Sequence, residues 1–483
     1  MKDPIIFWND VTNEMNREDH TAPMTGRQGG PTRSSRATAM AHLAMHDAFF
    51  GIDGGQALYL GAAAPNTPAA PPGGFTAKHE SAAITGAAQT VLAALYPGQR
   101  ATIDAMAMDI AGENETDAAA FEFGRKVAFA VMRARVDDGS DAPKVPVPYV
   151  YSSAKPRHRA DPLNAAGQVE PLGASWGHVK PFAVQAFHPL AAYPDFKGAA
   201  YDADHEEVRA KGGSASQPTT TRTIQETTIG LYWAYDGATK LGTPPRLYNQ
   251  IIQKIAKAKG NTVAQNARLF ALVNVAMGDA GIHAWYWKYH YDLWRPVVGI
   301  REYDNNWGPD AIGGQAIDGK ADPFWRPLGA PKTNDTAPGA RSFTPPFPAY
   351  PSGHATFGAA AFEMVRLFYG HGNEETVDNI AFEFVSDELN GISNDNDGAI
   401  RTRHERRFTS VADAMFENSI SRIYLGVHWR FDGTSAKTIQ NMLKKSSSGG
   451  TDGIGGVPLG RAIARDIFNS GLKLAHPNAV PPA

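Results

Sequence analysis

Long stretches free of helix breakers constrain the fold of this chain more than any other feature of its sequence. Apolar residues recur at helical spacing, and segments of clean two-residue alternation are scarce. We expect helices at about 35–50, 82–95, 118–136, 223–233, 247–259, 264–294, 355–369, 374–389, 409–425 and 462–470. Segments rich in Pro, Gly and Ser separate them near 61–74, 138–174, 305–350 and 444–460. The pattern predicts an all-α fold of two packed helical bundles joined by long Pro/Gly-rich loops.

The length and composition place few limits on domain number but exclude several kinds of site. The 483 residues are expected to form a single domain, 1–483, with one helical half at about 1–200 and a second, carrying the chemistry, at about 201–483. The absence of cysteine excludes disulfides, thiolate metal sites and a cysteine nucleophile. A net charge of −3 gives no indication of a nucleic-acid partner.

Membrane insertion is not expected either, because no run of 18 apolar residues occurs. The first residues, MKDPIIFWNDVTNEMN, show no apolar region of a secretion signal. The compartment therefore stays open between cytoplasmic, periplasmic and secreted, and the oligomeric state is open as well.

The first chemical motif is KYHYDLWRP, which runs from Lys288 to Pro296. Lys288 and Arg295 are seven residues apart, so a continuous helix would point both cations the same way, about 10.5 Å apart along its axis. Trp285 and Asp292 would share this stripe, and Pro296 would end the helix. Cations in such aromatic surroundings need an anionic partner.

The second motif is PAYPSGHATFG, residues 348–358. Ser352 is a favourable N-cap, and the residues after it are expected to form a helix. A helix N-terminus presents free N–H groups and a positive dipole end to an anion. Gly353 allows close backbone approach, and His354 lies where an acid/base group could act on the bound anion.

The third motif is SRIYLGVHWRFD, residues 421–432. Arg422 adds a third cation, and a ring nitrogen of His428 can reach an oxyanion. Asp432 follows four residues later and could hold the other ring nitrogen. Together the three motifs predict a site for a tetrahedral oxyanion that becomes five-coordinate, with arginine forks and a lysine charge around it.

These motifs, K-x6-R-P, P-S-G-H and S-R-x5-H-x3-D, resemble the signature of the type 2 acid phosphatase and vanadium haloperoxidase superfamily. The resemblance is strongest to the vanadium-dependent chloroperoxidase branch. It extends to 231–252, 455–473 and FWNDVTNEMNREDHT near the N-terminus, and thus covers nearly the whole chain.

The resemblance implies vanadate as the prosthetic group, with hydrogen peroxide and halide ions as substrates and a small organic acceptor as a further partner. His428 would be the protein ligand to vanadium. The oxygens of vanadate would be held by Lys288, Arg295, Ser352, the Gly353 N–H and Arg422. His354 would take a proton from hydrogen peroxide, Lys288 would polarise the peroxide, and hypohalous acid would leave.

Three acidic residues are expected to contact the site cations and His428 and to orient them. Asp236, in the segment WAYD, would pair with a site arginine, as the resemblance implies. Asp432 would orient His428, and Asp292 would lie next to the cations of its own motif.

Two aromatic residues bear on the halide. Trp285 and Phe347 match the chloroperoxidase branch, and Phe347 lies seven residues before His354, where bromoperoxidases tend to have a histidine. This favours chloride competence, with bromide also oxidised. One departure from the family concerns the 66 residues between His354 and Ser421, a gap longer than in much of the superfamily, so its loop geometry is not predicted.

An acid phosphatase of the same superfamily is the main alternative, because phosphate and vanadate share charge and shape. In that case His428 would form a phosphohistidine and His354 would protonate the leaving group. A non-catalytic anion-binding protein is a third reading, but binding alone does not require His354.

Overall fold

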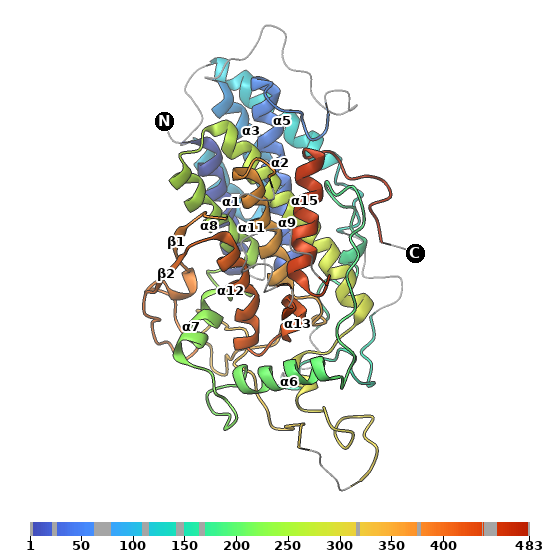
Figure 1. Ribbon diagram of the computed structural model, residues 1–483. Coiled ribbons are helices and arrows are strands. Elements are labelled where there is room, and N and C mark those ends of the chain that lie inside the picture. Colours follow the sequence, from blue (N-terminus) through green and yellow to red (C-terminus); the bar gives the residue numbers. More distant parts are fainter. Residues whose placement is uncertain are drawn as a thin grey trace.

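The computed structural model describes residues 3–21, 27–61, 79–108, 115–141, 149–163, 170–314, 319–373, 378–436, 438 and 452–481. In these residues helices dominate, and the strands form one two-stranded antiparallel sheet. Figure 1 shows an elongated body with the long helices in the upper part and irregular segments around α6 in the lower part. The all-α fold class predicted from the sequence is confirmed.

The N-terminal part contributes five helices. They are α1 (Pro4–Thr21), α2 (Gly30–Asp53), α3 (Glu80–Leu95), α4 (Arg100–Met108) and α5 (Glu115–Arg133). Two glycines let α3 and α5 cross closely: a Cβ on Gly86 would lie 2.1 Å from the carbonyl oxygen of Phe121, and a Cβ on Gly124 would lie 1.9 Å from that of Ala83. The sequence therefore sets this close helix contact through glycine.

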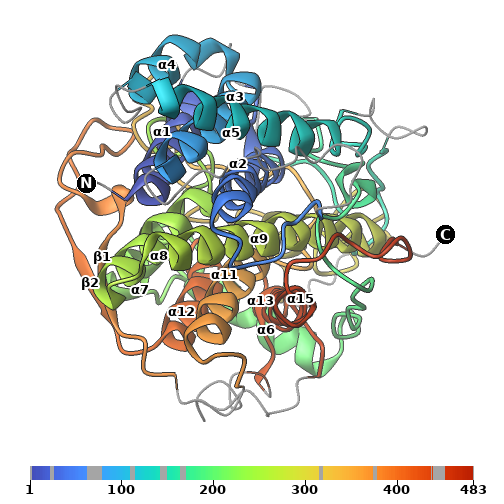
Figure 2. The same cartoon turned by 90° about the horizontal axis from the view of Figure 1, so that it is seen from above.

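The remaining helices follow residue 198. They are α6 (Ala199–Lys211), α7 (Ile224–Tyr232), α8 (Pro244–Lys259), α9 (Val263–Tyr291), α10 (Pro296–Gly299), α11 (Gly353–Tyr369), α12 (Val411–Tyr424), α13 (Arg430–Gly433) and α15 (Gly456–Ser470). Short 3-10 turns occur at η2 (Pro97–Gln99), η3 (Trp176–His178) and η4 (Asp387–Leu389). Seen from above, α9 lies between the N-terminal helices and the group α11, α12 and α15 (Figure 2).

The sequence of the central helix α9 accounts for its length and for the residue at which it ends. Thr262 caps it in a capping box with Gln265, and its 21 buried residues run almost without a break from Asn266 to Lys288. A helix that is apolar on all sides must be buried on all sides. Its C-cap, Asp292, adopts a left-handed conformation with φ 52°, which ends the helix at Tyr291.

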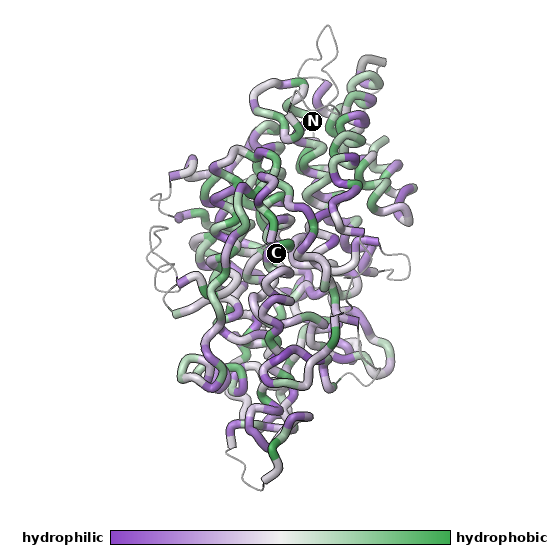
Figure 3. The backbone as a smooth tube through the Cα atoms, turned by 90° about the vertical axis from the view of Figure 1, so that its right-hand side faces the viewer, coloured by the Kyte–Doolittle hydropathy of each residue, from purple (hydrophilic) through white to green (hydrophobic). Residues whose placement is uncertain are grey.

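One hydrophobic core joins the two halves, since a single cluster of buried apolar residues includes members from Ile5 to Ala479. Green and purple alternate along the helical parts of the tube in Figure 3, as expected for helices that bury one face. Among the described helices, none combines the length and low polarity that crossing a membrane requires.

A buried carboxylate fastens α15 to α11. Glu363 on α11 accepts from Arg366, Arg461 and Arg465. Burial raises the pKa of this carboxyl, but the three guanidinium groups outweigh burial and lower its pKa to about 2. The glutamate is therefore charged at neutral pH, and its ion pairs hold the two helices together.

Several sequence expectations about elements need correction. The helix expected at 374–389 is wrong in its described part, where β1 (Phe382–Val385) pairs with β2 (Glu405–Phe408). Phe382 and Phe384 face inward while the residue between them is exposed, which is the two-residue period of a strand. The prediction also missed α1, α4 and α6, and it extended α9 by three residues.

Candidate active site

The three predicted motifs converge where α9, α11, α12 and α13 meet the loop after α7. A cavity of about 200 Å³ opens there, and its walls include Asp236, Gly353, His354, Arg422 and His428. Most of the exposed wall is apolar, so the polar groups present are few and clustered.

The N-terminus of α11 forms one wall. Ser352 is the N-cap, and its hydroxyl oxygen accepts from the Ala355 N–H at 3.4 Å. Gly353 begins the helix. A Cβ at this position would lie 3.3 Å from the Trp285 ring, which is closer than most Cβ atoms approach a neighbour. The N–H groups of this first turn have no partner within the helix, which makes the turn suitable for an oxyanion.

His428 is held in one tautomer. Its Nδ1 lies 2.7 Å from an oxygen of Asp432, and the same oxygen accepts the Trp429 N–H at 2.9 Å. Because a carboxylate only accepts, Nδ1 carries the proton and Nε2 keeps its lone pair. Nε2 is therefore the atom that could bind a metal ion or a phosphoryl group, in place of the hydrogen bond that it accepts from Arg295.

Two arginines belong to the site and differ in what holds them. Arg295 Nη1 donates to His428 Nε2 at 2.9 Å and to the Val427 carbonyl at 2.8 Å. Arg422 forms a two-point ion pair with Asp236 at 2.8 and 3.0 Å. Nη2 of Arg295, and Nε and Nη1 of Arg422, are buried and have no partner. Buried guanidinium N–H groups without acceptors indicate an anion site.

Lys288 is fully buried on the last turn of α9. Its ammonium donates to the carbonyls of Pro348, Ala349 and Pro351 at 2.9, 3.1 and 2.5 Å. All three N–H groups thus hold the segment that leads into Ser352. Contact with a bound oxyanion would require the anion to replace one of these carbonyls.

The expected two-turn stripe of Lys288 and Arg295 on one helix is wrong. Helix α9 ends at Tyr291, Arg295 is the extended N-cap of α10, and Pro296 begins that helix instead of ending one. Proline is common in the first turn of a helix, so Pro296 indicates the start of α10. The two cations meet because the chain turns at Asp292, and helical spacing does not bring them together.

His354 lies on the first turn of α11 with its side chain on the loop after α7. Its Nε2 is 2.6 Å from the carbonyl oxygen of Ala234. A carbonyl only accepts, so Nε2 carries the proton and Nδ1 keeps the lone pair. Nδ1 of His354 can therefore accept a proton, as an acid/base group requires.

Two aromatic rings pack against the cations. The Trp285 and Phe347 rings lie 4.9 Å apart, and the Lys288 ammonium lies 5.5 and 5.0 Å from their centres. The Arg295 guanidinium lies 4.8 Å from the Phe347 ring. The rings exclude water from one side of the cluster while their π faces stabilise the cations.

Asp292 takes a different place from the one expected. Its carboxylate accepts from the Tyr149 hydroxyl at 2.5 Å and lies 3.9 Å from Arg157. Within the described residues this carboxylate pairs with none of the three site cations, and Asp292 contacts Lys288 only through its backbone N–H, which donates to the Lys288 carbonyl at 2.8 Å. Its left-handed backbone redirects the chain between Lys288 and Arg295.

Sequence reasoning missed the part of the cavity wall that comes from the N-terminal half. His20, Gly30 and Pro31 line it, together with Leu172, Pro244, Phe343 and Phe357. His20 donates from Nδ1 to the Asn16 carbonyl and accepts the Gly30 N–H, so it has no spare donor. Only the resemblance of the N-terminal segment pointed to this region. The N-terminal half thus contributes to the cavity wall, and the expectation that the second half carries the chemistry stays a prediction.

Electrostatics favour an anion at this place. Lys288, Arg295 and Arg422 are at most 1% exposed and face two carboxylates, Asp236 and Asp432. Burial raises the pKa of Asp236, and it raises the pKa of Asp432 to about 8, so the carboxylates offset the cations only in part. Burial and the neighbouring cations hold the pKa values of Lys288, His354 and His428 well below their usual ranges. Burial lowers the pKa of Arg295 to about 9. An anion in the cavity would oppose all four shifts.

The donor set fits an oxyanion such as vanadate. His428 Nε2 offers a nitrogen ligand, and Nη2 of Arg295 together with Nε and Nη1 of Arg422 are buried N–H donors without a partner. Ser352 and the first turn of α11 add the N-terminus of a helix, which stabilises an anion.

Comparisons with known proteins show the family of this chain. Residues 2–157 match the vanadium chloroperoxidase N-terminal domain, and residues 268–443 match the second helical-bundle domain of vanadium chloroperoxidase. The chain is 36% identical to the vanadium chloroperoxidase of Curvularia inaequalis, over 99% of this chain and 91% of that protein. This chain belongs to the vanadium chloroperoxidase family.

Solved structures of vanadium haloperoxidases share the fold. A bacterial vanadium-dependent iodoperoxidase matches with a TM-score of 0.63 at 20% identity, covering 95% of each chain. A holo-type bacterial vanadium-dependent chloroperoxidase matches with a TM-score of 0.60 at 17% identity, covering 95% of this chain and 96% of the other. The family membership and this fold identify the protein as an enzyme of the vanadium haloperoxidase type.

Proposed function

We propose that this vanadium haloperoxidase oxidises chloride and bromide with hydrogen peroxide to hypohalous acid. The observation that carries the proposal is the pair of buried arginines with unpaired N–H groups: Arg295 donates to His428 Nε2, and Arg422 lines the same cavity as His428. A peroxide and a halide are then the substrates, and a small organic acceptor fits the mostly apolar cavity of about 200 Å³.

His428 would hold vanadate through Nε2, with Asp432 keeping the proton on Nδ1. Arg295, Arg422, Ser352 and the Gly353 N–H would hold its oxygens. Lys288 would join them by exchanging one backbone carbonyl for an oxygen. When bound, vanadate supplies a Lewis acid that activates peroxide without changing oxidation state.

His354 would act as the base. Its Nδ1 would accept a proton from hydrogen peroxide and return a proton to the leaving water, while Nε2 stays bonded to Ala234. The overall reaction consumes one halide, one peroxide and one proton, and it yields one hypohalous acid and one water. Asp236 would keep Arg422 in place during this cycle.

The halide would approach along Trp285 and Phe347. Phe347 faces two cations, so a halide beside this ring would be attracted electrostatically and only weakly hydrated. These surroundings support chloride as well as bromide. We also propose that the chain acts as one domain, because both halves share one core and line one cavity.

The test is reconstitution of the apo protein with orthovanadate, followed by halogenation of monochlorodimedone with peroxide and bromide or chloride. We expect activity that depends on vanadate and on both substrates. Absence of vanadate-dependent halogenation, together with good turnover of p-nitrophenyl phosphate, would overturn the proposal.

That second outcome corresponds to the alternative function, an acid phosphatase with a phosphohistidine at His428. The lone pair on Nε2 and the proton held by Asp432 on Nδ1 would suit a nucleophile equally well. Quenching the 32P-labelled protein under alkaline denaturing conditions, where a phosphohistidine survives, and testing for loss of the label in His428→Ala separates this route from peroxide chemistry.

A further inference from the structure

The loop that holds both His354 and Arg422 contains a strained residue. Ala234 accepts from His354 Nε2, and Asp236 pairs with Arg422. Between them, Tyr235 adopts a left-handed backbone with φ 44°, which residues with a Cβ rarely adopt. This conformation separates the three residues: two reach the active site, while the Tyr235 side chain packs elsewhere.

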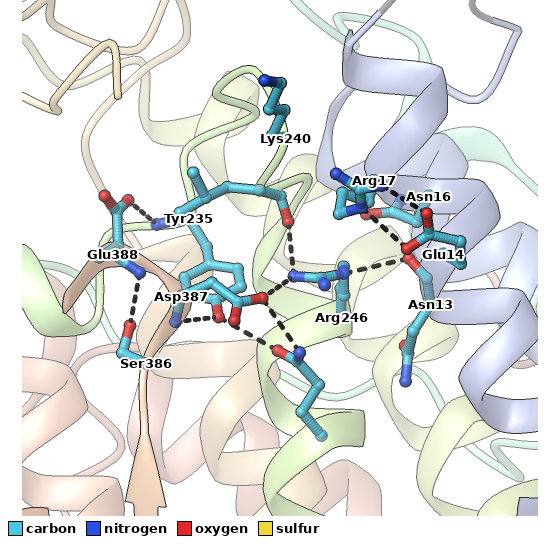
Figure 4. A network of polar contacts seen from close by, with 12 residues as sticks. Asn13, Glu14, Asn16, Arg17, Tyr235, Lys240, Arg246, Ser386, Asp387 and Glu388 are labelled. Carbon is cyan, nitrogen blue, oxygen red and sulfur yellow. Dashed lines mark hydrogen bonds and ion pairs between the residues drawn. The ribbon is translucent and has the colours of Figure 1, made fainter. Parts of the chain in front are cut away.

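Tyr235 is anchored at two points by the segment between His354 and Ser421, the one whose length departs from the family pattern. Its backbone N–H donates to Glu388 Oε1 at 3.0 Å, and its hydroxyl accepts the Asp387 N–H at 2.9 Å. Figure 4 shows Tyr235 between Glu388 and Arg246, with Asp387 beside its ring.

The anchors are themselves fixed from several elements. Glu388 Oε2 accepts from Arg401 and Thr333, both at 2.5 Å, and the carboxylate is fully buried. Asp387 accepts from Arg246 of α8 at 2.6 Å. A left-handed residue persists only where its surroundings over-determine it, and here three separate parts of the chain do so.

We propose that Glu388 and Tyr235 are positioning residues, which hold the Ala234–Asp236 loop so that His354 and Arg422 take their working places. Neither residue lines the cavity, so both act through the loop. The inference rests on the roles proposed above for His354 and Arg422. It also gives the extended segment a function, since Asp387, Glu388 and Arg401 all come from it.

The experiment compares three variants in orthovanadate binding by calorimetry on the apo protein and in bromide oxidation. Glu388→Leu removes the acceptor and the charge. The double variant Glu388→Gln/Arg401→Met keeps a carbonyl acceptor for the Tyr235 N–H and removes the charge from both partners. Glu363→Gln is the matched control, because Glu363 is also a buried carboxylate paired with arginines but lies away from the loop.

Glu388→Leu should weaken vanadate binding and lower kcat by about tenfold each, the size seen when groups supporting a ligand are removed. KM for bromide should change much less. The double variant should recover most of both losses, whereas Glu363→Gln should lose only thermal stability. A merely structural role predicts that Glu388→Leu behaves like Glu363→Gln, and that outcome would overturn the proposal.

Tyr235→Phe keeps the proposal testable if Glu388→Leu does not fold, because it removes only the hydroxyl anchor. As in Glu388→Leu, kcat and vanadate affinity should fall, here severalfold, while KM for bromide stays the same. Unchanged values in Tyr235→Phe, or a double variant as impaired as Glu388→Leu, would refute the anchoring. Wild-type protein that binds no vanadate would instead contradict the proposed function itself.

Discussion

Asp432→Asn tests how much the carboxylate behind His428 contributes to vanadate binding. In the native protein one oxygen of Asp432 accepts from His428 Nδ1 and from the Trp429 N–H. Asparagine can place its carbonyl oxygen there, so both bonds persist but the charge is lost. Hydrogen bonds to charged groups contribute about 1.5–3 kcal/mol and neutral ones about 1, a difference of about 0.5–2 kcal/mol.

That difference corresponds to a loss of about 2- to 30-fold in vanadate affinity. Titration of the apo variant with orthovanadate by calorimetry measures it. Asp47→Asn is a matched control, since Asp47 is equally buried and accepts from His46 Nδ1 and the Tyr59 N–H far from the site. A folded Asp432→Asn that binds vanadate as wild type does would refute the reasoning, and so would an equal loss in Asp47→Asn.

Three further predictions address the ligand, the halide and acid stability. His428→Ala should retain no vanadium after gel filtration, whereas His354→Ala should retain vanadium but lose halogenation; wild-type turnover in His428→Ala would contradict the ligand assignment. Phe347→His should lower the ratio of chloride to bromide oxidation severalfold, and an unchanged ratio would remove Phe347 from the halide path. The Glu363 pKa lies below the usual 4.5, so its stabilisation is present above about pH 4.5 and is lost as pH falls towards 2. Glu363→Gln should therefore lose about 3 kcal/mol of unfolding free energy near pH 7, a deficit that shrinks in acid, as urea unfolding at several pH values will show.

The helices were predictable because each carries a local signal. The long apolar runs of α9 and α11 and the N-cap at Ser352 can be read from neighbouring residues. Errors arose where long-range contacts decide the structure. The strand β1 forms because Phe382 pairs with Phe408, which follows 26 residues later in the chain. No local sequence pattern in this otherwise helical region indicates that partner.

The site residues were predictable for a different reason. Ser352, Gly353, His354, Arg422 and His428 lie within two short motifs, and the motif spacing together with the family resemblance identified them. The local geometry was harder to predict. Lys288 and Arg295 were placed on one helix, but a left-handed turn at Asp292 separates them, and a single aspartate in that conformation leaves no clear mark in sequence.

By itself, the sequence determined the helical architecture and the set of residues able to hold a five-coordinate oxyanion, because helix signals and side-chain chemistry are local properties. Only the tertiary structure decided which protons and lone pairs these residues present. The tautomer of His354 depends on the Ala234 carbonyl, that of His428 depends on Asp432, and the Lys288 ammonium is directed by three backbone carbonyls. Backbone carbonyls are the same in every residue, so only the fold can tell which of them lies within reach.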